Sequence, residues 1–534
     1  MKYIQHTIFL LCFLTSNLFS QPSSVVRPRF VVGIMVDGLQ QRHIDVLWNY
    51  LDSNGIRRLI TEGTSLQSTS YNIVSSGNAA DIATVMTGTT PHYNGISANN
   101  IYKRSTNNVE SIMLDVNQLG VGTTENVSAH NLLSSTIVDE LMMAYPNKSK
   151  SYAVAINAPE ALMMGGHTAT GVAWMDDVYL KWVSSSYYSD SLPKSASEMN
   201  MNESFSILAN RVWQPLYSVN TYLNQASIVD KKIGFEYLPS SLKDKKTSVS
   251  LLKNTPSANT LVADLGYKIF VDEQLGTDIY PDMLMLQFTV RTPNEKTSVM
   301  QTIEKEDIYL RLDKDIEKLV RYIENKIGKE NLCVFLYSNQ TDIHTPVEFG
   351  KNKIPAGYFN AERSLSLVNV YLMAIYGQEK WIQGYYGKNI YLNRAKIEEK
   401  KLNLQQFQQT VAEFMLEFEG IQAAFPSSTV LSMGGSANTE MAKLRNSAHK
   451  SSMGDVVITL LPGWIEVDNK NNPVGESNAI KTTTPLYFYG WNIKGQAVTT
   501  PYLTIDIAPT ISKILNIPLP NSCIGKVIEE VVEK

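Results

Sequence analysis

Three stretches of the sequence place polar side chains at the end of a short apolar run. They end at Asp37, at Thr289–Thr292 and at Tyr337–Gln340. If these runs are strands of an open parallel sheet, their carboxyl ends meet at one edge, which is where such sheets bind ligands. Asp37 is the only carboxylate at the three ends, and a lone carboxylate could hold only a weakly bound cation without further ligands.

Histidine, a common metal ligand, shows no metal-binding pattern in this sequence. None of the histidines after His6 lies in a His-x-x-x-His, His-Glu-x-x-His or Cys/His pair. These histidines are His43, His92, His130, His167, His344 and His449. Asp342 and His344 follow the third strand end and are the best candidates to form a metal site with Asp37, although we favour a surface loop for both. For His167 we favour a structural hydrogen bond.

Short apolar runs alternate with helical patterns along the chain, which is typical of βα units around a mostly parallel sheet. The predicted strands are rich in Val, Ile, Leu or aromatic residues and cover 30–36, 152–156, 284–289, 332–337, 455–461 and 486–489. The clearest predicted helix is Glu306–Ile327, with Gly328 as its stop signal. The stretches at about 170–280 and 350–480 break the alternation, and we interpret them as insertions that cap the sheet.

The composition indicates a globular protein. The chain has 534 residues, of which 43% are hydrophobic and 18% charged, so it can bury a large core, and the composition favours neither disorder nor a coiled coil. The net charge is -4, and the basic residues are spread along the chain. This pattern does not favour nucleic-acid binding.

The amino terminus is typical of an export signal. Lys2 precedes the apolar stretch Ile8–Leu14, and a more polar stretch, Thr15–Ser20, follows it. We expect residues 1–20 to be a signal peptide and residues 21–534 to form a single domain with the two insertions. No later apolar run has the roughly 20 residues of a membrane helix. The expected location is the periplasm or exterior of a Gram-negative bacterium.

The order and spacing of several motifs resemble those of the alkaline phosphatase superfamily. The likeness is greatest to the secreted phosphate-irrepressible alkaline phosphatases, near the type I phosphodiesterases and nucleotide pyrophosphatases. The motifs include Val36-Asp-Gly38, Thr87-Gly88, Gly95-Ile96, Gly166-His167, Trp174-Met-Asp-Asp177, Glu306-Asp307 and Thr504–Thr510. The resemblance implies an α/β fold with a central, mostly parallel sheet, flanking helices and cap insertions. It also implies chemistry that uses two zinc ions and a Thr or Ser nucleophile.

Most zinc-ligand positions of that family hold other residues in this chain. The resemblance places the first ligand on Asp37, one ligand pair on Thr292 and Lys296, and another pair on Asn339 and Gln340. The last ligand histidine belongs near residue 475, where the chain has none. Without companions, Asp37 is expected to cap the next helix or to accept backbone hydrogen bonds. Lys296 could replace part of the lost positive charge, but we favour a solvated lysine on a loop.

The positions that would attack or hold the phosphate are also changed. The resemblance places the nucleophile on Asn78, whose amide cannot attack phosphorus, and a Lys-x-Arg pair on Asn157 and Pro159. Asn99 matches a kept phosphate contact. We call the following set the relic pocket: Asp37, Asn78, Asn99, Asn157, Thr292, Lys296, Asn339 and Gln340.

These substitutions predict an exported, catalytically inactive protein that binds a partner or serves as a scaffold in the cell envelope. We expect no catalytic residue and no cofactor, a protein partner, and an open choice between a phosphorylated and a sugar ligand for the relic pocket. The alternative is an active metal-dependent phosphatase or phosphodiesterase with a degenerate or rebuilt site. Zinc would then be the cofactor, held by Asp37, Asp342 and His344.

Overall fold

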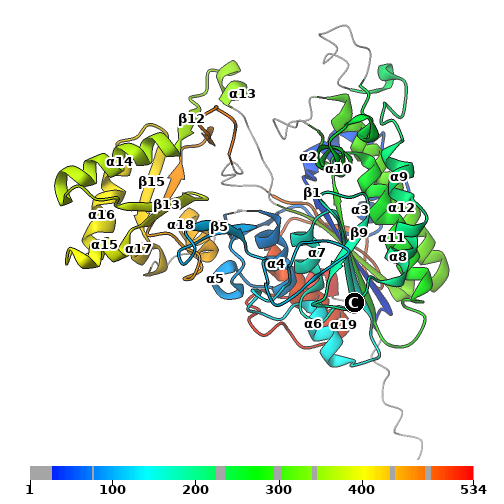
Figure 1. Ribbon diagram of the computed structural model, residues 1–534. Coiled ribbons are helices and arrows are strands. Elements are labelled where there is room, and N and C mark those ends of the chain that lie inside the picture. The colour runs from blue at the N-terminus through cyan, green and yellow to red at the C-terminus, as the bar shows by residue number, and fades with distance from the viewer. Residues whose placement is uncertain are drawn as a thin grey trace, which may run out of the picture.

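The structure is a computed structural model that describes residues 27–74, 77–223, 235–293, 302–339, 346–432, 439–474 and 483–532. The predicted signal peptide lies outside these ranges. Figure 1 shows a central sheet covered by helices and, to its left, a smaller second part. The second part is formed by residues between 346 and 474.

A ten-stranded sheet forms the centre of the larger part, in the order β19-β2-β18-β11-β1-β10-β7-β8-β9-β6. The strands from β11 to β8 run parallel, whereas β18 and β9 run antiparallel to their neighbours. In that order they span Gln496–Val498, Thr64–Leu66, Leu486–Gly490, Leu332–Ser338, Phe30–Asp37, Asp282–Thr289, Ser151–Ala155, Gly171–Met175, Trp182–Ser185 and Gly120–Val121. This confirms the predicted α/β fold with a mostly parallel sheet.

Strand β1 lies in the middle of the sheet and is buried on both faces. Phe30, Val32 and Ile34 pack into one hydrophobic core, and Val31 and Met35 pack into the core on the other face. A continuous apolar run is what a strand covered by helices on both faces requires. The packing fixes the backbone of β1 and therefore the position of the residue at its end.

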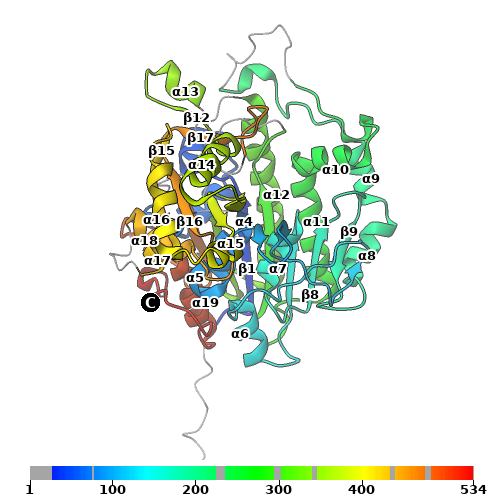
Figure 2. The same ribbon diagram turned by 60° about the vertical axis from the view of Figure 1, so that its left-hand side comes forward.

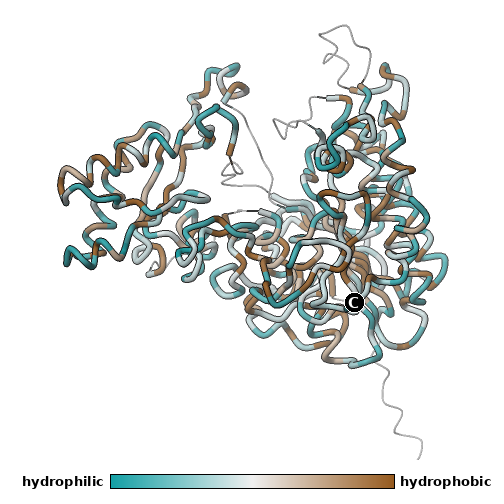
Figure 3. The backbone as a smooth tube through the Cα atoms, viewed as in Figure 1, coloured by the Kyte–Doolittle hydropathy of each residue, from teal (hydrophilic) through white to brown (hydrophobic). Residues whose placement is uncertain are grey.

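Helices cover both faces of the central sheet, and Figure 3 shows hydrophobic colour along the central strands and alternating colour along the outer helices. The first core is covered by α2 (Gln41–Leu47), α3 (Ile56–Thr61), α8 (Lys194–Met201), α9 (Ser204–Ala209), α10 (Lys245–Lys253), α11 (Pro256–Asp272) and α12 (Ile303–Ile327). The second is covered by α4 (Asn78–Thr87), α6 (Ile137–Ala144), α7 (Ala158–Gly165), α19 (Ile507–Leu515) and α20 (Glu529–Val532). In the described ranges, no helix has the length and apolarity to cross a membrane.

The predicted helix at 306–327 is α12, and Gly328 follows it as expected. The helix begins at Ile303, three residues earlier than predicted, because Thr302 caps it by accepting a hydrogen bond from the backbone N–H of Lys305. Capping side chains of this kind set where a helix starts.

The second part is built on an antiparallel sheet in the order β13-β14-β16-β15. These strands span Ile382–Tyr386, Asn389–Leu392, Val456–Leu460 and Ile421–Pro426. Helices α14 (Ala361–Tyr376) and α16 (Leu404–Met415) share a separate hydrophobic core with this sheet. The predicted strand at 455–461 is therefore β16 of this second sheet and not part of the central sheet. A short apolar run predicts a strand but does not say which sheet it joins.

The second part also contains a separate parallel pair of strands, β12 (Gly357–Asn360) and β17 (Trp464–Val467), and further short helices. These helices are α13 (Pro346–Lys351), α15 (Arg394–Glu399), α17 (Ser427–Ser432) and α18 (Glu440–Ser447). Figure 2 turns this part toward the viewer, in front of the central sheet.

A buried carboxylate joins the two parts. Asp455 is fully buried and accepts hydrogen bonds of 2.7 Å from Arg104 and Arg394 and from the backbone N–H of Leu392. Arg104 follows the hairpin strand β4 (Asn100–Lys103), which pairs with β5 (Asn108–Ser111) in the central part. The guanidinium of Arg104 also lies over the ring of Tyr391. These contacts tie the hairpin to the second sheet.

Replacing Asp455 with alanine should therefore destabilise the protein. Two arginines would lose their buried counter-charge, and breaking a buried ion pair typically costs about 3–5 kcal/mol. Thermal unfolding followed by near-ultraviolet circular dichroism measures the effect. Glu399→Ala, which removes an exposed partner of Lys396, is the matched control and should change the midpoint little. An Asp455→Ala midpoint equal to the wild-type value would contradict this role.

Candidate functional site

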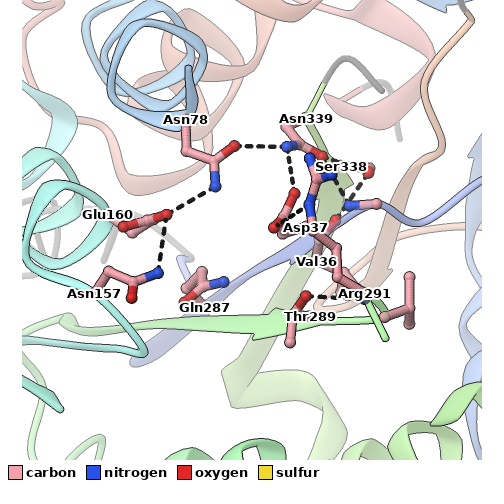
Figure 4. Close-up of polar contacts among 12 residues, drawn as sticks. Val36, Asp37, Asn78, Asn157, Glu160, Gln287, Thr289, Arg291, Ser338 and Asn339 are labelled. Carbon is pink, nitrogen blue, oxygen red and sulfur yellow. Dashed lines mark hydrogen bonds and ion pairs between the residues drawn. The ribbon is translucent and has the colours of Figure 1, made fainter. Parts of the chain in front are cut away.

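Three strand ends meet at one edge of the central sheet, as Figure 4 shows. Asp37 ends β1, Thr289 pairs with it at the end of β10, and Asn339 follows directly after β11. β1 lies between β10 and β11, so side chains from all three strand ends face the same space. The sheet thus positions the candidate site.

The Asp37 carboxylate is held by two side chains. It is 7% exposed, and its Oδ1 accepts a 2.5 Å hydrogen bond from Nδ2 of Asn339. Its Oδ2 accepts from Nε of Arg291 at 2.8 Å, which is also an ion pair. The prediction that Asp37 caps the next helix is wrong, because Gln40 occupies the N-cap of α2 without a side-chain cap bond. The Asp37 carboxylate accepts from Arg291 and Asn339, and not from the N–H groups at the start of α2.

Asn78 extends this contact across the site. Its Oδ1 accepts a 2.6 Å hydrogen bond from Nδ2 of Asn339, and its Nδ2 donates to Oε1 of Glu160 at 2.7 Å. Both ends of the amide are therefore occupied. We call Asp37, Arg291, Asn339, Asn78 and Glu160 the site network.

Asn99 holds the start of the helix that carries Asn78. Its Oδ1 accepts a 2.9 Å hydrogen bond from the backbone N–H of Ala79, in the first turn of α4. Gly77 makes this approach possible, because a Cβ there would lie 2.7 Å from Oδ1 of Asn99, and its φ is +128°. An anion at this helix start would find that N–H already bonded.

Glu160 is the second buried carboxylate of the site. It lies in the first turn of α7, is 3% exposed, and its Oε1 also accepts a 3.5 Å hydrogen bond from Asn157. Its Oε2 has no hydrogen-bond partner in the part of the chain that the structure describes. Burial raises the pKa of the Glu160 carboxyl; the bond from Asn78 opposes the rise and the charge of Asp37 adds to it.

The structure places some of the other predicted site residues, and some lie outside the residues that it describes. Thr292 lies half-buried on the loop after β10, next to Arg291. Lys296, Gln340, Asp342 and His344 lie outside the described residues. The relic pocket therefore has Asp37, Asn78 and Asn339 in direct contact, Asn157 joined to them through Glu160, and Asn99 placed behind the start of α4.

His167 makes structural hydrogen bonds away from this site. Its Nδ1 lies 3.0 Å from the hydroxyl of Tyr187, and its Nε2 lies 3.3 Å from the carbonyl oxygen of Ser134. These hydrogen bonds are the structural role predicted for His167.

A polar pocket of about 270 Å³ opens beside the site network. Asp37, Asn157, Gln287 and Thr289 line it from the strand ends. From the other side it is lined by Asp177 of the loop after β8 and by Lys246, Ser250, Lys253 and Asn254 of α10 and the residue after it. Lys253 pairs with Asp177 and donates to Oδ1 of Asn157 at 3.2 Å. The two carboxylates and two lysines leave the pocket close to neutral.

Among the described residues, the side chains that contact Asp37 do not fit a zinc ion. Both of its carboxylate oxygens have partners, and those partners are an amide and a guanidinium. Arginine stays protonated and has no lone pair to offer, and its charge would repel a cation. In the described ranges, no three His, Cys, Asp or Glu side chains lie close enough together to hold a metal.

The sequence-based reasoning missed Arg291 and Glu160. Arg291 lies within the strand end Thr289–Thr292, where a cation two residues from Thr289 could have been matched with Asp37. Glu160 follows Asn157-Ala-Pro, and a proline with an acidic residue in the first turn is a helix-start signal. Either signal would have placed a charged side chain at this edge of the sheet.

Known proteins resemble this chain over nearly its whole length. Residues 31–487 match the family model of the type I phosphodiesterases and nucleotide pyrophosphatases. A protein named calcium-transporting ATPase from Myroides odoratus is 28% identical, and the match covers 100% of both chains. Alkaline phosphatase PafA from Elizabethkingia meningoseptica is 27% identical, over 96% of this chain and 95% of that protein.

Alkaline phosphatase PhoV from Synechococcus elongatus is also 27% identical, over 96% of this chain and 94% of that protein. The crystal structure of wild-type PafA superposes on the present structure with a TM-score of 0.87 at 26% identity. That superposition covers 96% of this chain and 100% of the PafA chain. The two proteins therefore share the same overall fold.

Glu160→Gln should stabilise the protein in a pH-dependent way. Because burial raises the pKa of Glu160 in the folded state, the folded protein binds more protons than the unfolded chain between the ordinary pKa of 4.5 and the raised value. Wild-type stability therefore falls as pH rises through this window, and the glutamine removes that fall. Urea unfolding at several pH values should show a gain at pH 7 that disappears below pH 4.5.

The exposed Glu417→Gln variant is the control and should show no such pH-dependent gain. A Glu160→Gln stability difference that stays constant with pH would show that the carboxyl pKa is not raised by burial.

Proposed function

The chain belongs to the type I phosphodiesterase / nucleotide pyrophosphatase family, within the alkaline phosphatase superfamily, and we propose that it is a member without catalytic activity. The protein keeps the fold of the phosphatases and uses it for binding, as a partner or scaffold in the cell envelope. Fold alone does not fix function, so the site has to carry this proposal.

The observation that carries it is the Arg291–Asp37 ion pair, completed by the bond from Asn339. Zinc chemistry at this site needs Asp37 as a ligand. Here the carboxylate already has a cation at 2.8 Å, and that cation belongs to the protein. A metal would have to displace an ion pair that compensates a largely buried charge.

The substitution of the nucleophile supports the same proposal. Asn78 stands at the start of α4 with both ends of its amide hydrogen-bonded. The nitrogen lone pair of an amide is delocalised into its carbonyl group, so Asn78 is not a nucleophile that could attack phosphorus, unlike the activated hydroxyl of a serine or threonine. The residue contributes to holding the site network together.

The charges near the site favour a neutral ligand over a phosphorylated one. Asp37 and Glu160 place two carboxyl groups near Asn78, where a phosphate would lie. The neighbouring guanidinium of Arg291 is already paired with Asp37. The amide of Asn157 stands where the resemblance expects a cation. Hydroxyl groups of a sugar suit the mixed donors and acceptors of the polar pocket better than a phosphate does.

A location outside the cytoplasm and a protein partner complete the proposal. Support for export comes from the pattern of residues 1–20. Support for a partner comes from helix α14, where Leu367, Val370 and Ile375 are between 49% and 62% exposed.

The Leu367→Glu variant should capture less partner protein from envelope extracts than the wild type does, because it places a charge on this apolar surface. Capture that is unchanged by Leu367→Glu would argue against this surface.

Purified protein that lacks residues 1–20 should show no zinc-dependent turnover of phosphomonoesters or phosphodiesters. Asn78→Thr should remain inactive as well, because a hydroxyl alone does not supply the missing ligands. Release of p-nitrophenol from p-nitrophenyl phosphate and bis-p-nitrophenyl phosphate measures both activities, with PafA as the positive control. Zinc-dependent turnover that Asp37→Ala abolishes would overturn the proposal.

A further inference from the structure

A second and larger cavity lies between the central part and the second sheet. Its volume is about 450 Å³, and it is lined by Ile73 and Ile101 from the central part and by Tyr385, Leu444 and Met453 from the second part. We propose that this cavity binds an uncharged small molecule with a mainly apolar body and one hydrogen-bonding group.

The walls of the cavity are mostly apolar. Leu444, Met453 and Val457 line it and belong to a small hydrophobic cluster with Val430 and Ala448. Small-molecule sites typically have volumes of roughly 300–1,000 Å³, apolar and aromatic walls and a few polar groups, and they often lie where two structural parts meet. This cavity has each of these properties.

Two polar side chains that line the cavity have an atom left to bond a ligand. His449 is 9% exposed, and its Nδ1 lies 2.7 Å from Oγ of Ser451, while its Nε2 has no partner among the described residues. Oδ1 of Asn99 accepts a hydrogen bond from the backbone N–H of Ala79. Nδ2 of Asn99 has no hydrogen-bond partner within the same ranges. A ligand with one polar group could satisfy either nitrogen.

The lining favours a ligand without charge. Burial lowers the pKa of His449 below its ordinary value, and the charges of Lys450 and His92 lower it further, so the ring is neutral at pH 7. Lys388 and Lys443 are balanced in formal charge by Glu440 and Glu466.

The Glu466 carboxylate is held within this lining by a hydrogen bond. Burial raises the pKa of the Glu466 carboxyl, which accepts a 3.0 Å hydrogen bond from the hydroxyl of Tyr385. A charged ligand would lose its hydration without meeting a net opposite charge.

The cavity is distinct from the site network, although the two are neighbours. Gly77 and Asn99 line the cavity, whereas Asn78, which follows Gly77, points to Asn339 and Glu160. The inference goes beyond the proposed function and does not depend on the loss of catalysis. If the protein proved to be an active enzyme, the cavity would still be present.

N-phenyl-1-naphthylamine is a suitable probe because it is neutral and mainly apolar and has one N–H group. Its fluorescence should rise and saturate when it is titrated with the protein lacking residues 1–20, with one probe bound per chain. Ala98→Phe, which fills the cavity from a half-buried lining position, should weaken binding at least tenfold. His449→Gln should weaken it about threefold or more, and 1-anilinonaphthalene-8-sulfonate, the related anion, should bind more weakly than the neutral probe.

His130→Gln is the matched control, because His130 is exposed and does not line the cavity, and it should bind the probe as the wild type does. Thermal unfolding shows whether each variant is folded, and the His449→Gln result decides if Ala98→Phe does not fold. No saturable binding, or equal affinity in the wild type and the folded variants, would overturn the inference. Phosphatase turnover with zinc would instead overturn the proposed function alone.

Discussion

A carboxylate buried at the end of a central strand needs a compensating charge or hydrogen bonds, and the site is organised around this need at Asp37. The carboxylate is buried because β1 is covered on both faces of the sheet. Arg291 and Asn339 compensate it, and they come from the ends of the two strands that flank β1. The same strand order could bring metal ligands together at the ends of these strands. In this protein it brings a guanidinium and an amide to Asp37.

The rest of the site follows from this arrangement. Asn339 uses one amide group to bond both Asp37 and Asn78, and Asn78 passes the contact on to Glu160. These bonds occupy most of the polar atoms that could otherwise act on a substrate, and a connected polar network of this kind favours one fixed geometry. We infer that the phosphatase fold has been kept for its shape and surfaces, and that binding takes place where polar atoms are left over.

The sequence predicted the features that depend on local pattern. The strands of the central sheet and the helix before Cys333 follow from short apolar runs and helical spacing, and the polar residues after β1 and β11 do meet. Pattern could not place β16 in the second sheet, because an apolar run does not identify its neighbour. Nor could it pair Asp37 with Arg291, since that contact depends on how a loop directs one side chain across 254 residues of sequence.

The most direct test of this account is a crystal structure of the protein grown with excess zinc, with anomalous data collected on both sides of the zinc absorption edge. We predict that Arg291 remains paired with Asp37 and that no anomalous peak lies within bonding distance of that carboxylate. A zinc peak on Asp37, with the Arg291 side chain displaced, would contradict the claim that the protein supplies its own cation at this site.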